Sequence, residues 1–244
     1  MWPKLSKKSS IALPWLATKS GSYLSGSFHQ ENDALNYPGV QCVAMSAAAI
    51  VFAHDQRAQQ WNQAIINSIL REGDRYYGEC KDKHQYLFVS ELRTQTALFG
   101  HEVTFSINDL DIIALAENES KKDATKKVNQ FFVNGSSDRF AIVTAKGKAR
   151  AIFRQAGEYF CFDSHAVNSE LEEDGSNGTA KLVRFSSKKA FVDAVIEMTS
   201  GSIANIAPVQ NVAIGGLVAE PPAQFALHDG RMKDDEFGVA AVMA

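Results

Sequence analysis

The feature that most constrains the fold of this chain is an almost wholly apolar, alanine-rich segment at residues 43–53. The segment is too long for most strands, and apolar side chains occupy every side of it, so it predicts a helix that is buried all round. Pro38 and Gly39 end whatever element precedes it, and Cys42 stands at the first turn of the predicted helix. The rest of the chain has to supply the elements that cover this helix.

The composition provides enough apolar material for such a core and gives no sign of a polyanionic partner. Hydrophobic residues make up 45% of the 244 residues and charged residues 22%, as in globular domains. A formal net charge of −3 gives no reason to expect nucleic acid as a partner. No apolar run approaches the ~20 residues that span a bilayer, so we expect no membrane partner either.

The three cysteines, Cys42, Cys80 and Cys161, are an odd and sparse set that does not suit a disulfide framework. They fit reduced thiols in a cytoplasmic protein. The histidines are scattered, and the sequence contains no Cys-x-x-Cys or His-x-x-x-His pair and no phosphate-binding glycine loop. We therefore expect no metal and no other cofactor.

Helices come first in the predicted order of elements. Residues 56–71 have an amphipathic pattern typical of a second helix, which we expect Gly73 to end. Residues 121–133 predict a further helix, which we expect Asn134 and Gly135 to end.

An antiparallel meander follows. Its predicted strands are residues 139–145, 149–155, 158–163 and 179–185, whereas residues 101–107 predict a separate strand before the helix at residues 121–133. A last helix comes after them, with Ser186 or Ser187 as its N-cap. Helices followed by a meander predict an α+β fold.

Composition divides the chain into three regions. Residues 1–24 form a basic, serine-rich arm without acidic residues, which we expect to be flexible. Residues 25–201 form the folded domain. Residues 202–244 form a tail that is rich in Gly, Ala, Val and Pro and lacks clear periodicity, although part of it can pack back on the domain.

Cys42 is the first candidate for chemistry. The N-terminus of a helix is the positive end of its dipole, which stabilises a thiolate. A cysteine beside an apolar run can also be a small hydrophobic residue that fills the core, because free cysteine is among the most buried residue types. Taken alone, the position of Cys42 leaves both interpretations open.

Asp163 and His165 are the second candidate, at the end of a predicted strand. Side chains alternate along a strand, so these two point to the same side, and Phe160 and Phe162 point to the other side as core. The carboxylate can accept from one imidazole nitrogen and leave the other for a thiol. The alternative for an isolated Asp-x-His is a surface turn.

Gln30, twelve residues before Cys42, is the third candidate. Its amide can donate to the oxyanion of a tetrahedral intermediate, with the backbone N–H of Cys42 as a second donor. Gln41 competes for this role because it is adjacent to the cysteine. We rank Gln30 first, since a neighbour in sequence usually directs its side chain away from the shared site.

With these residues in place, the sequence resembles the herpesvirus large tegument protein deubiquitinase family. The resemblance runs from about residue 25 to 199 and rests on "QCVAMSAAAIVFA" downstream of Gln30, "YFCFDSH" at the end of the meander, and "GTAKLVRFSSKKAFVDAVIEM". These enzymes are papain-like cysteine proteases that cleave ubiquitin, or the related modifier NEDD8, after its C-terminal Gly-Gly. The chain departs from the family at residues 44–46, where Ala-Met-Ser stands in place of an expected Asn.

The resemblance implies a papain-like α+β fold and a thiol-dependent deubiquitinase whose partner is ubiquitin or a ubiquitin-like modifier. It implies that Cys42 is the nucleophile and His165 the general base and then acid. It further implies that Asp163 orients His165 and that Gln30 is the oxyanion donor, with Asn168 as an alternative orienting residue.

The same residues also suit a papain-like acyltransferase or amidase that acts on another substrate, and the fold suits a non-catalytic ubiquitin-binding domain. The acidic loop at residues 170–174 follows His165 and is placed to face basic residues of a modifier tail, or it is simply solvated. We expect a monomer that is either a viral protein or a bacterial effector delivered to the host cytosol.

Overall fold

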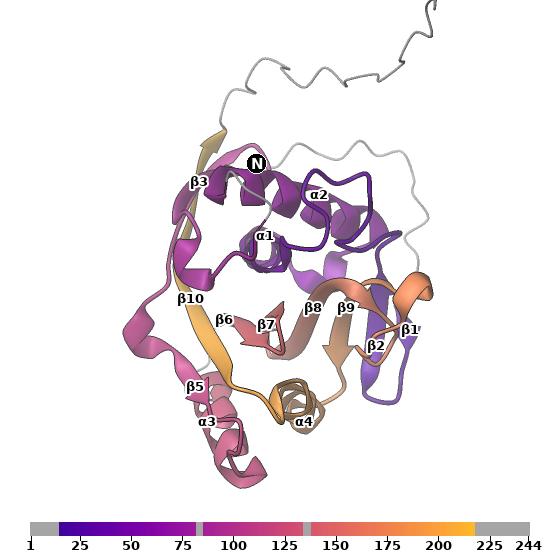
Figure 1. Cartoon of the computed structure of the whole chain (residues 1–244), viewed down its shortest axis with the longest axis vertical. Helices are drawn as coiled ribbons and strands as arrows, with labels where there is room; N and C mark the ends of the chain where they lie inside the picture. The colour runs from indigo at the N-terminus through magenta and orange to yellow at the C-terminus, as the bar shows by residue number, and fades with distance from the viewer. Residues whose placement is uncertain (1–14, 82–84, 134–137, 218–244) are drawn as a thin grey trace, which may run out of the picture.

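The structure is a computed structural model that describes residues 15–81, 85–133 and 138–217. In it the chain forms a ten-stranded antiparallel sheet with helices against both faces (Figure 1). The helices are α1 (Cys42–Asp55), α2 (Gln63–Cys80), α3 (Lys121–Val133) and α4 (Lys188–Thr199). Short 3-10 helices are η1 (Ala58–Gln60), η2 (Val89–Glu91), η3 (Asp109–Asp111) and η4 (Gly175–Asn177). The strands are β1 (Leu16–Ala17), β2 (Gly21–Ser25), β3 (Gln95–Leu98), β4 (His101–Ser106), β5 (Ile113–Leu115), β6 (Arg139–Ala145), β7 (Lys148–Gln155), β8 (Glu158–Val167), β9 (Thr179–Phe185) and β10 (Ala204–Leu217). Their order is β1-β2-β9-β8-β7-β6-β10-β4-β3, with β5 also beside β10.

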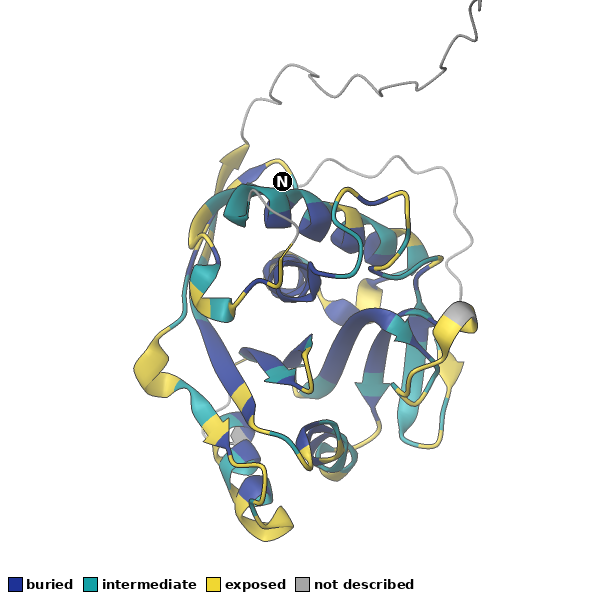
Figure 2. Ribbon diagram, viewed as in Figure 1, coloured by how far each residue is buried: buried dark blue, intermediate teal, exposed yellow. Residues whose placement is uncertain are grey.

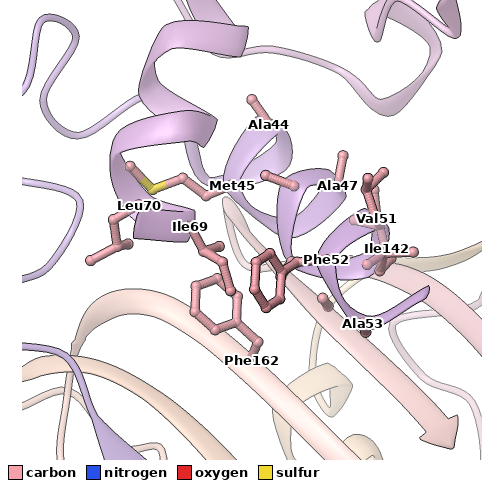
Figure 3. Close-up of a cluster of buried hydrophobic side chains, with 14 of the residues drawn as sticks. Ala44, Met45, Ala47, Val51, Phe52, Ala53, Ile69, Leu70, Ile142 and Phe162 are labelled. Atoms are coloured by element: carbon pink, nitrogen blue, oxygen red, sulfur yellow. The ribbon is translucent and has the colours of Figure 1, made fainter. Parts of the chain in front are cut away.

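The alanine-rich segment forms the central helix, as the sequence predicts. α1 begins at Cys42, and all residues from 42 to 53 are buried, which Figure 2 shows as a nearly continuous dark helix. Figure 3 shows Met45 of α1 beside Ile69 of α2, with Phe162 of β8 close by. The helix therefore lies between α2 and the sheet, which explains why it carries no polar face.

The two faces of the sheet support different layers because side chains alternate along each strand. Phe160 and Phe162 of β8 belong to the cluster with α1 and α2, as predicted, whereas Cys161 between them belongs to the cluster with α3 and α4. The predicted α+β arrangement is confirmed. β8 continues past its predicted end at residue 163 to Val167, and this extension carries the candidate site.

The predicted meander is confirmed in β6, β7, β8 and β9, and the helix at residues 121–133 in α3. The tight turns of the meander have positive φ at their central residues, 53° and 72° at Lys146 and Gly147, as hairpin turns require. Ser187 is the N-cap of α4, where its side chain accepts from the backbone N–H of Ala190. Asn134 and Gly135 lie outside the described residues.

The second helix differs from its prediction at both ends. We expected residues 56–71, but α2 begins after Asn62, whose side chain caps Ile65 N, and it continues through Gly73. A Cβ at Gly73 would lie 2.5 Å from the Cα of Met45, so a glycine is required where the two helices touch. Gly73 permits close helix packing and does not end the helix.

Part of the expected tail belongs to the sheet. Residues 204–217, which the sequence analysis placed in the tail, form β10, and β10 pairs with β6, β5 and β4. Pro208 obscured this strand because proline rarely occupies a central strand. Residues 207–209 pair only with β6, between the segments that pair with β5 and β4, so the missing N–H is tolerated there.

Part of the expected arm also belongs to the sheet. β1 and β2, at residues 16–17 and 21–25, form an antiparallel pair, and β2 joins the sheet beside β9. The remainder of the arm, residues 1–14, and the remainder of the tail, residues 218–244, lie outside the described residues.

Candidate active site

Cys42 is the first residue of α1, and although it is only 4% exposed, it lines a groove of about 630 Å³. Its backbone N–H has no acceptor within the helix, because the first N–H groups of any helix lack one. The positive end of the helix dipole lies at the same place. A negative charge on the sulfur or on a bound oxygen would be stabilised here.

His165 and Asp163 lie together near the end of β8. Asp163 Oδ1 accepts from His165 Nδ1 at 2.6 Å and from the His165 backbone N–H at 2.9 Å. The imidazole also interacts with the side chain of Cys42, which is one of the causes that raise its pKa. Because Asp163 holds Nδ1, Nε2 is the nitrogen left for the thiol. The three predicted residues are thus connected from the strand to the start of the helix.

The charges around the imidazole favour its protonated form. Burial lowers the pKa of His165, but hydrogen bonds to Asp163 and Cys42 and the charges of both outweigh burial and raise it to about 9. Burial also acts to raise the pKa of Asp163, whereas His165 and Arg150 together hold it well below its usual range. An imidazolium is the kind of partner that stabilises a neighbouring thiolate.

Arg150 of β7 is a partner of Asp163 that the sequence analysis missed. Its Nε donates to Asp163 Oδ2 at 2.5 Å, and both residues are buried. With one oxygen held by Arg150 and the other by His165, the carboxylate cannot rotate away from the imidazole. The sequence did contain a signal for this partner. In the predicted β7–β8 hairpin, counting residues back from the turn places residue 150 opposite residue 163.

Gln30 lies in the segment between β2 and α1 and is 2% exposed. Its Oε1 accepts from the Ser164 hydroxyl at 3.0 Å, and its backbone N–H donates to the Ser164 carbonyl at 2.8 Å. No described residue accepts from Gln30 Nε2, and this atom is not sealed from solvent. The amide therefore has a donor available for a ligand.

The competing glutamine has a different position. Gln41 is fully buried, and its Nε2 donates both to the Gln30 carbonyl and to Asp74 Oδ1, each at 3.2 Å. Its Oε1 accepts from the backbone N–H of Val40 at 2.9 Å. Both amide hydrogens are already used to hold the chain before α1, so Gln41 has no donor for an oxyanion.

Asn168, the alternative to Asp163, is engaged in the acidic loop. Its Oδ1 accepts from the backbone N–H groups of Glu170 and Glu172, and its Nδ2 donates to the Glu172 carboxylate. Both ends of the amide therefore stabilise the loop. The geometry favours Asp163 as the partner of His165.

A match to a protein-family model shows which family the chain belongs to. The model for the N-terminal conserved region of the herpesvirus tegument protein matches residues 25–212. The chain belongs to this tegument family. Its fold is the papain-like α+β fold expected from the sequence. None of the curated proteins compared with the chain matches it.

The solved structures that are similar to the tegument-family domain include these two. One is the ubiquitin-specific protease of murine cytomegalovirus tegument protein M48, in complex with a ubiquitin-based suicide substrate. It has a TM-score of 0.59 at 13% identity, over 79% of this chain and 86% of that one. The other is UfSP from C. elegans, with a TM-score of 0.35 at 14% identity over 85% of this chain and 37% of that one. At 13% identity the first likeness shows the fold.

The groove of the tegument-family domain runs past Cys42 between an aromatic rim and the sheet. Tyr86 and Phe88, which are 65% and 69% exposed, form the rim. Small residues, Ala145, Gly147, Ala149 and Ala207, line much of the sheet side, together with Thr144, Asn205 and Lys148. A narrow extended chain fits this combination better than a bulky one.

The acidic loop expected to face a modifier tail makes contacts within the tegument-family domain. Glu173 forms an ion pair with Lys148, a residue that also lines the groove. Glu170 accepts from the backbone N–H of Lys19 and from the Ser20 hydroxyl. These contacts fix the loop beside the groove.

Two further properties bear on cofactors and membranes. Over residues 15–81, 85–133 and 138–217, no group of three or more His, Cys, Asp or Glu side chains is arranged to hold a metal ion. Within the same residues, no helix has the length and apolar character needed to cross a membrane.

Proposed function

We propose that this chain is a cysteine-dependent deubiquitinase that hydrolyses the bond after the C-terminal Gly-Gly of ubiquitin or a ubiquitin-like modifier. The observation that carries the proposal is the hydrogen-bonded pair of Asp163 and His165, which interacts with Cys42 at the start of α1, where Cys42 lines a groove. Two findings support it: membership of the tegument family, and the likeness in fold to a ubiquitin-specific protease of a cytomegalovirus.

In the proposed reaction the Cys42 sulfur attacks the carbonyl carbon of the terminal glycine. The C–S bond forms and the carbonyl π pair moves to oxygen, where the Gln30 amide and the Cys42 backbone N–H donate to it. His165 then gives a proton to the leaving amine of the lysine as the C–N bond breaks. Water, deprotonated by His165, attacks the thioester and releases the modifier and the thiol.

The shape of the groove supports a glycine-ended substrate. A Gly-Gly sequence is the narrowest peptide, and the alanines and Gly147 opposite the aromatic rim leave room for its backbone. Tyr86 and Phe88 expose apolar surface that a modifier could bury as its tail enters. The three cysteines are free, which is consistent with action in the reducing cytoplasm of a host cell.

Hydrolysis of fluorogenic C-terminal amides tests the proposal. We expect turnover of the ubiquitin or the NEDD8 amide, no turnover by the Cys42→Ala variant, and unchanged turnover by Cys80→Ser, since Cys80 lies outside the groove. The SUMO amide serves as a specificity control. If the wild-type protein binds ubiquitin without hydrolysing any of the three amides, the chain is a binding domain and the proposal is wrong. Turnover of an unrelated acyl substrate alone would instead identify an acyltransferase or amidase.

A further inference from the structure

Ser164 lies between the two residues of the proposed acid–base pair, yet it contacts neither of their reacting atoms. It is 1% exposed, and alternation along β8 directs its side chain away from Asp163 and His165. Its hydroxyl donates to Gln30 Oε1 at 3.0 Å, and its carbonyl accepts from the Gln30 backbone N–H at 2.8 Å. Residues 134 positions apart are thus joined by two hydrogen bonds.

The orientation of the Gln30 amide matters because its two ends have opposite effects on an oxyanion. A rotation by 180° exchanges the N–H₂ donor for the carbonyl acceptor, and the two ends are nearly the same size. The donor end stabilises an oxyanion, whereas the acceptor end would repel it. The protein therefore needs a group that distinguishes the two ends.

The Ser164 hydroxyl is such a group. Where it donates to Oε1, the N–H₂ is directed elsewhere and has no acceptor among the described residues. In the reverse orientation the hydroxyl would have to accept, and its own buried hydrogen would lose its acceptor, which is costly. No other described residue donates to Gln30 Oε1.

We propose that Ser164 is a positioning residue that holds the Gln30 amide with its donor end free for the oxyanion. Two successive residues of β8 then orient the site: Asp163 orients the imidazole, and Ser164 orients the oxyanion donor. The inference rests on the proposed function, which assigns the donor role to Gln30.

Steady-state kinetics of Ser164→Ala give the first test. We expect kcat to fall about tenfold with little change in KM, a part of the ~10²–10³-fold that loss of an oxyanion donor costs. Ser164→Thr keeps the hydroxyl and should restore most of the rate. Ser46→Ala is a matched control, because Ser46 is equally buried on the helix of Cys42, and its hydroxyl has no hydrogen-bond partner among the described residues.

A double-mutant cycle separates positioning from a merely structural role. Gln30→Ala should lower kcat by ~10²–10³-fold. Once Gln30 is gone, Ser164 has no amide to orient, so adding Ser164→Ala should cause no further loss. If the two losses multiply, or if Ser164→Ala alone retains the wild-type kcat, the inference is wrong.

Two small thiol reagents give a readout that does not depend on ubiquitin. Iodoacetamide alkylates Cys42 by displacing iodide, without forming an oxyanion, so Ser164→Ala should leave this rate within about twofold. A peptide aldehyde ending in glycinal forms a hemithioacetal whose oxygen occupies the oxyanion position, so its affinity should fall about tenfold, in line with partial loss of the donor. Equal losses in both arms contradict the inference. If the wild-type enzyme fails only on ubiquitin substrates, the proposed function fails while these two arms still test Ser164.

Discussion

At the scale of single residues, the carboxylate of Asp163 controls the protonation of the site. It accepts from His165 Nδ1 on one oxygen and from Arg150 on the other, with no exposure to solvent. The imidazole has a pKa raised to about 9 from 6.5, despite the opposing effect of burial. The stability that the raised pKa of His165 contributes is therefore complete below about pH 6.5 and is lost as the pH rises through about 9. The lowered pKa of Asp163 has the opposite sign, because its contribution is present above the ordinary carboxyl pKa of 3.8 and is lost as the pH falls below it.

The same pairing predicts the pH dependence of activity. The proposed reaction needs a protonated His165 for the leaving amine, so kcat/KM of the wild-type protein should fall on the alkaline side near pH 9. Asp163→Asn removes the hydrogen bond and charge that raise the pKa, so the alkaline limb should move to lower pH. The rate should also fall by up to ~10⁴-fold, through a wrong tautomer or a loosened imidazole.

Asn168→Ala is the matched control for Asp163→Asn, since Asn168 contacts only the acidic loop. We expect it to keep the wild-type profile. If Asp163→Asn is fully active with an unmoved alkaline limb, Asp163 does not orient the imidazole.

The sequence predicted those site residues that short-range sequence patterns mark. Cys42 at a helix start, and Asp163 and His165 on one side of a strand, follow from short-range patterns. Arg150 and Ser164 were missed because their partners lie elsewhere: one across a hairpin, the other in the segment before α1. A serine or arginine in a strand gives no local signal of such a partner.

At the scale of elements, the contact between α1 and α2 holds Cys42, the proposed nucleophile, in place. Gly73 of α2 lies against the backbone of Met45, one turn into the helix that begins with Cys42. The sequence pattern showed that both segments are helical, but it could not show where they touch. The sequence therefore predicted that Gly73 ends the helix, whereas in the structure Gly73 lies where the two helices come close together.

Gly73→Ala should destabilise the protein by about 1–3 kcal/mol, as overpacking of a core does, because the new methyl group would press on backbone that cannot rotate away. Chemical denaturation monitored by circular dichroism measures the change. Gly216→Ala is the control, because a Cβ there meets nothing within 4 Å. Equal stability of both variants would show that the two helices separate easily, and α1 would then not be held as described.

At the scale of the whole molecule, the sheet depends on β10, a strand that is distant in sequence from the candidate site. β10 lies between β6 and β4, and its residues Ile206, Ala207 and Val209 are buried. The sequence could not reveal this strand, since Pro208 and two glycines interrupt its pattern and its partners lie far back in the chain. Two groove residues lie close to this strand: Ala145 is in β6, which pairs with β10, and Ala149 is in the adjacent strand β7.

A chain that ends at residue 203 should therefore fail to fold, because β6 loses one of its two neighbours, β4 and β5 lose their pairing with β10, and the groove loses a wall. A chain that ends at residue 217 keeps every described contact, and we expect it to retain a cooperative thermal transition and its activity. Circular dichroism melting and the fluorogenic assay test both chains. A folded, active chain ending at residue 203 would contradict the role of β10.

In the proposed reaction Cys42, activated by His165 and Asp163, attacks the C-terminus of a ubiquitin-like modifier. The most direct measurement is peptide mapping by mass spectrometry after incubation with ubiquitin that carries a C-terminal propargylamide, with a NEDD8 probe in parallel. We predict one covalent adduct, on the peptide that contains Cys42, and none in the Cys42→Ala variant. No adduct with either probe, or an adduct on Cys80 or Cys161, would contradict the account.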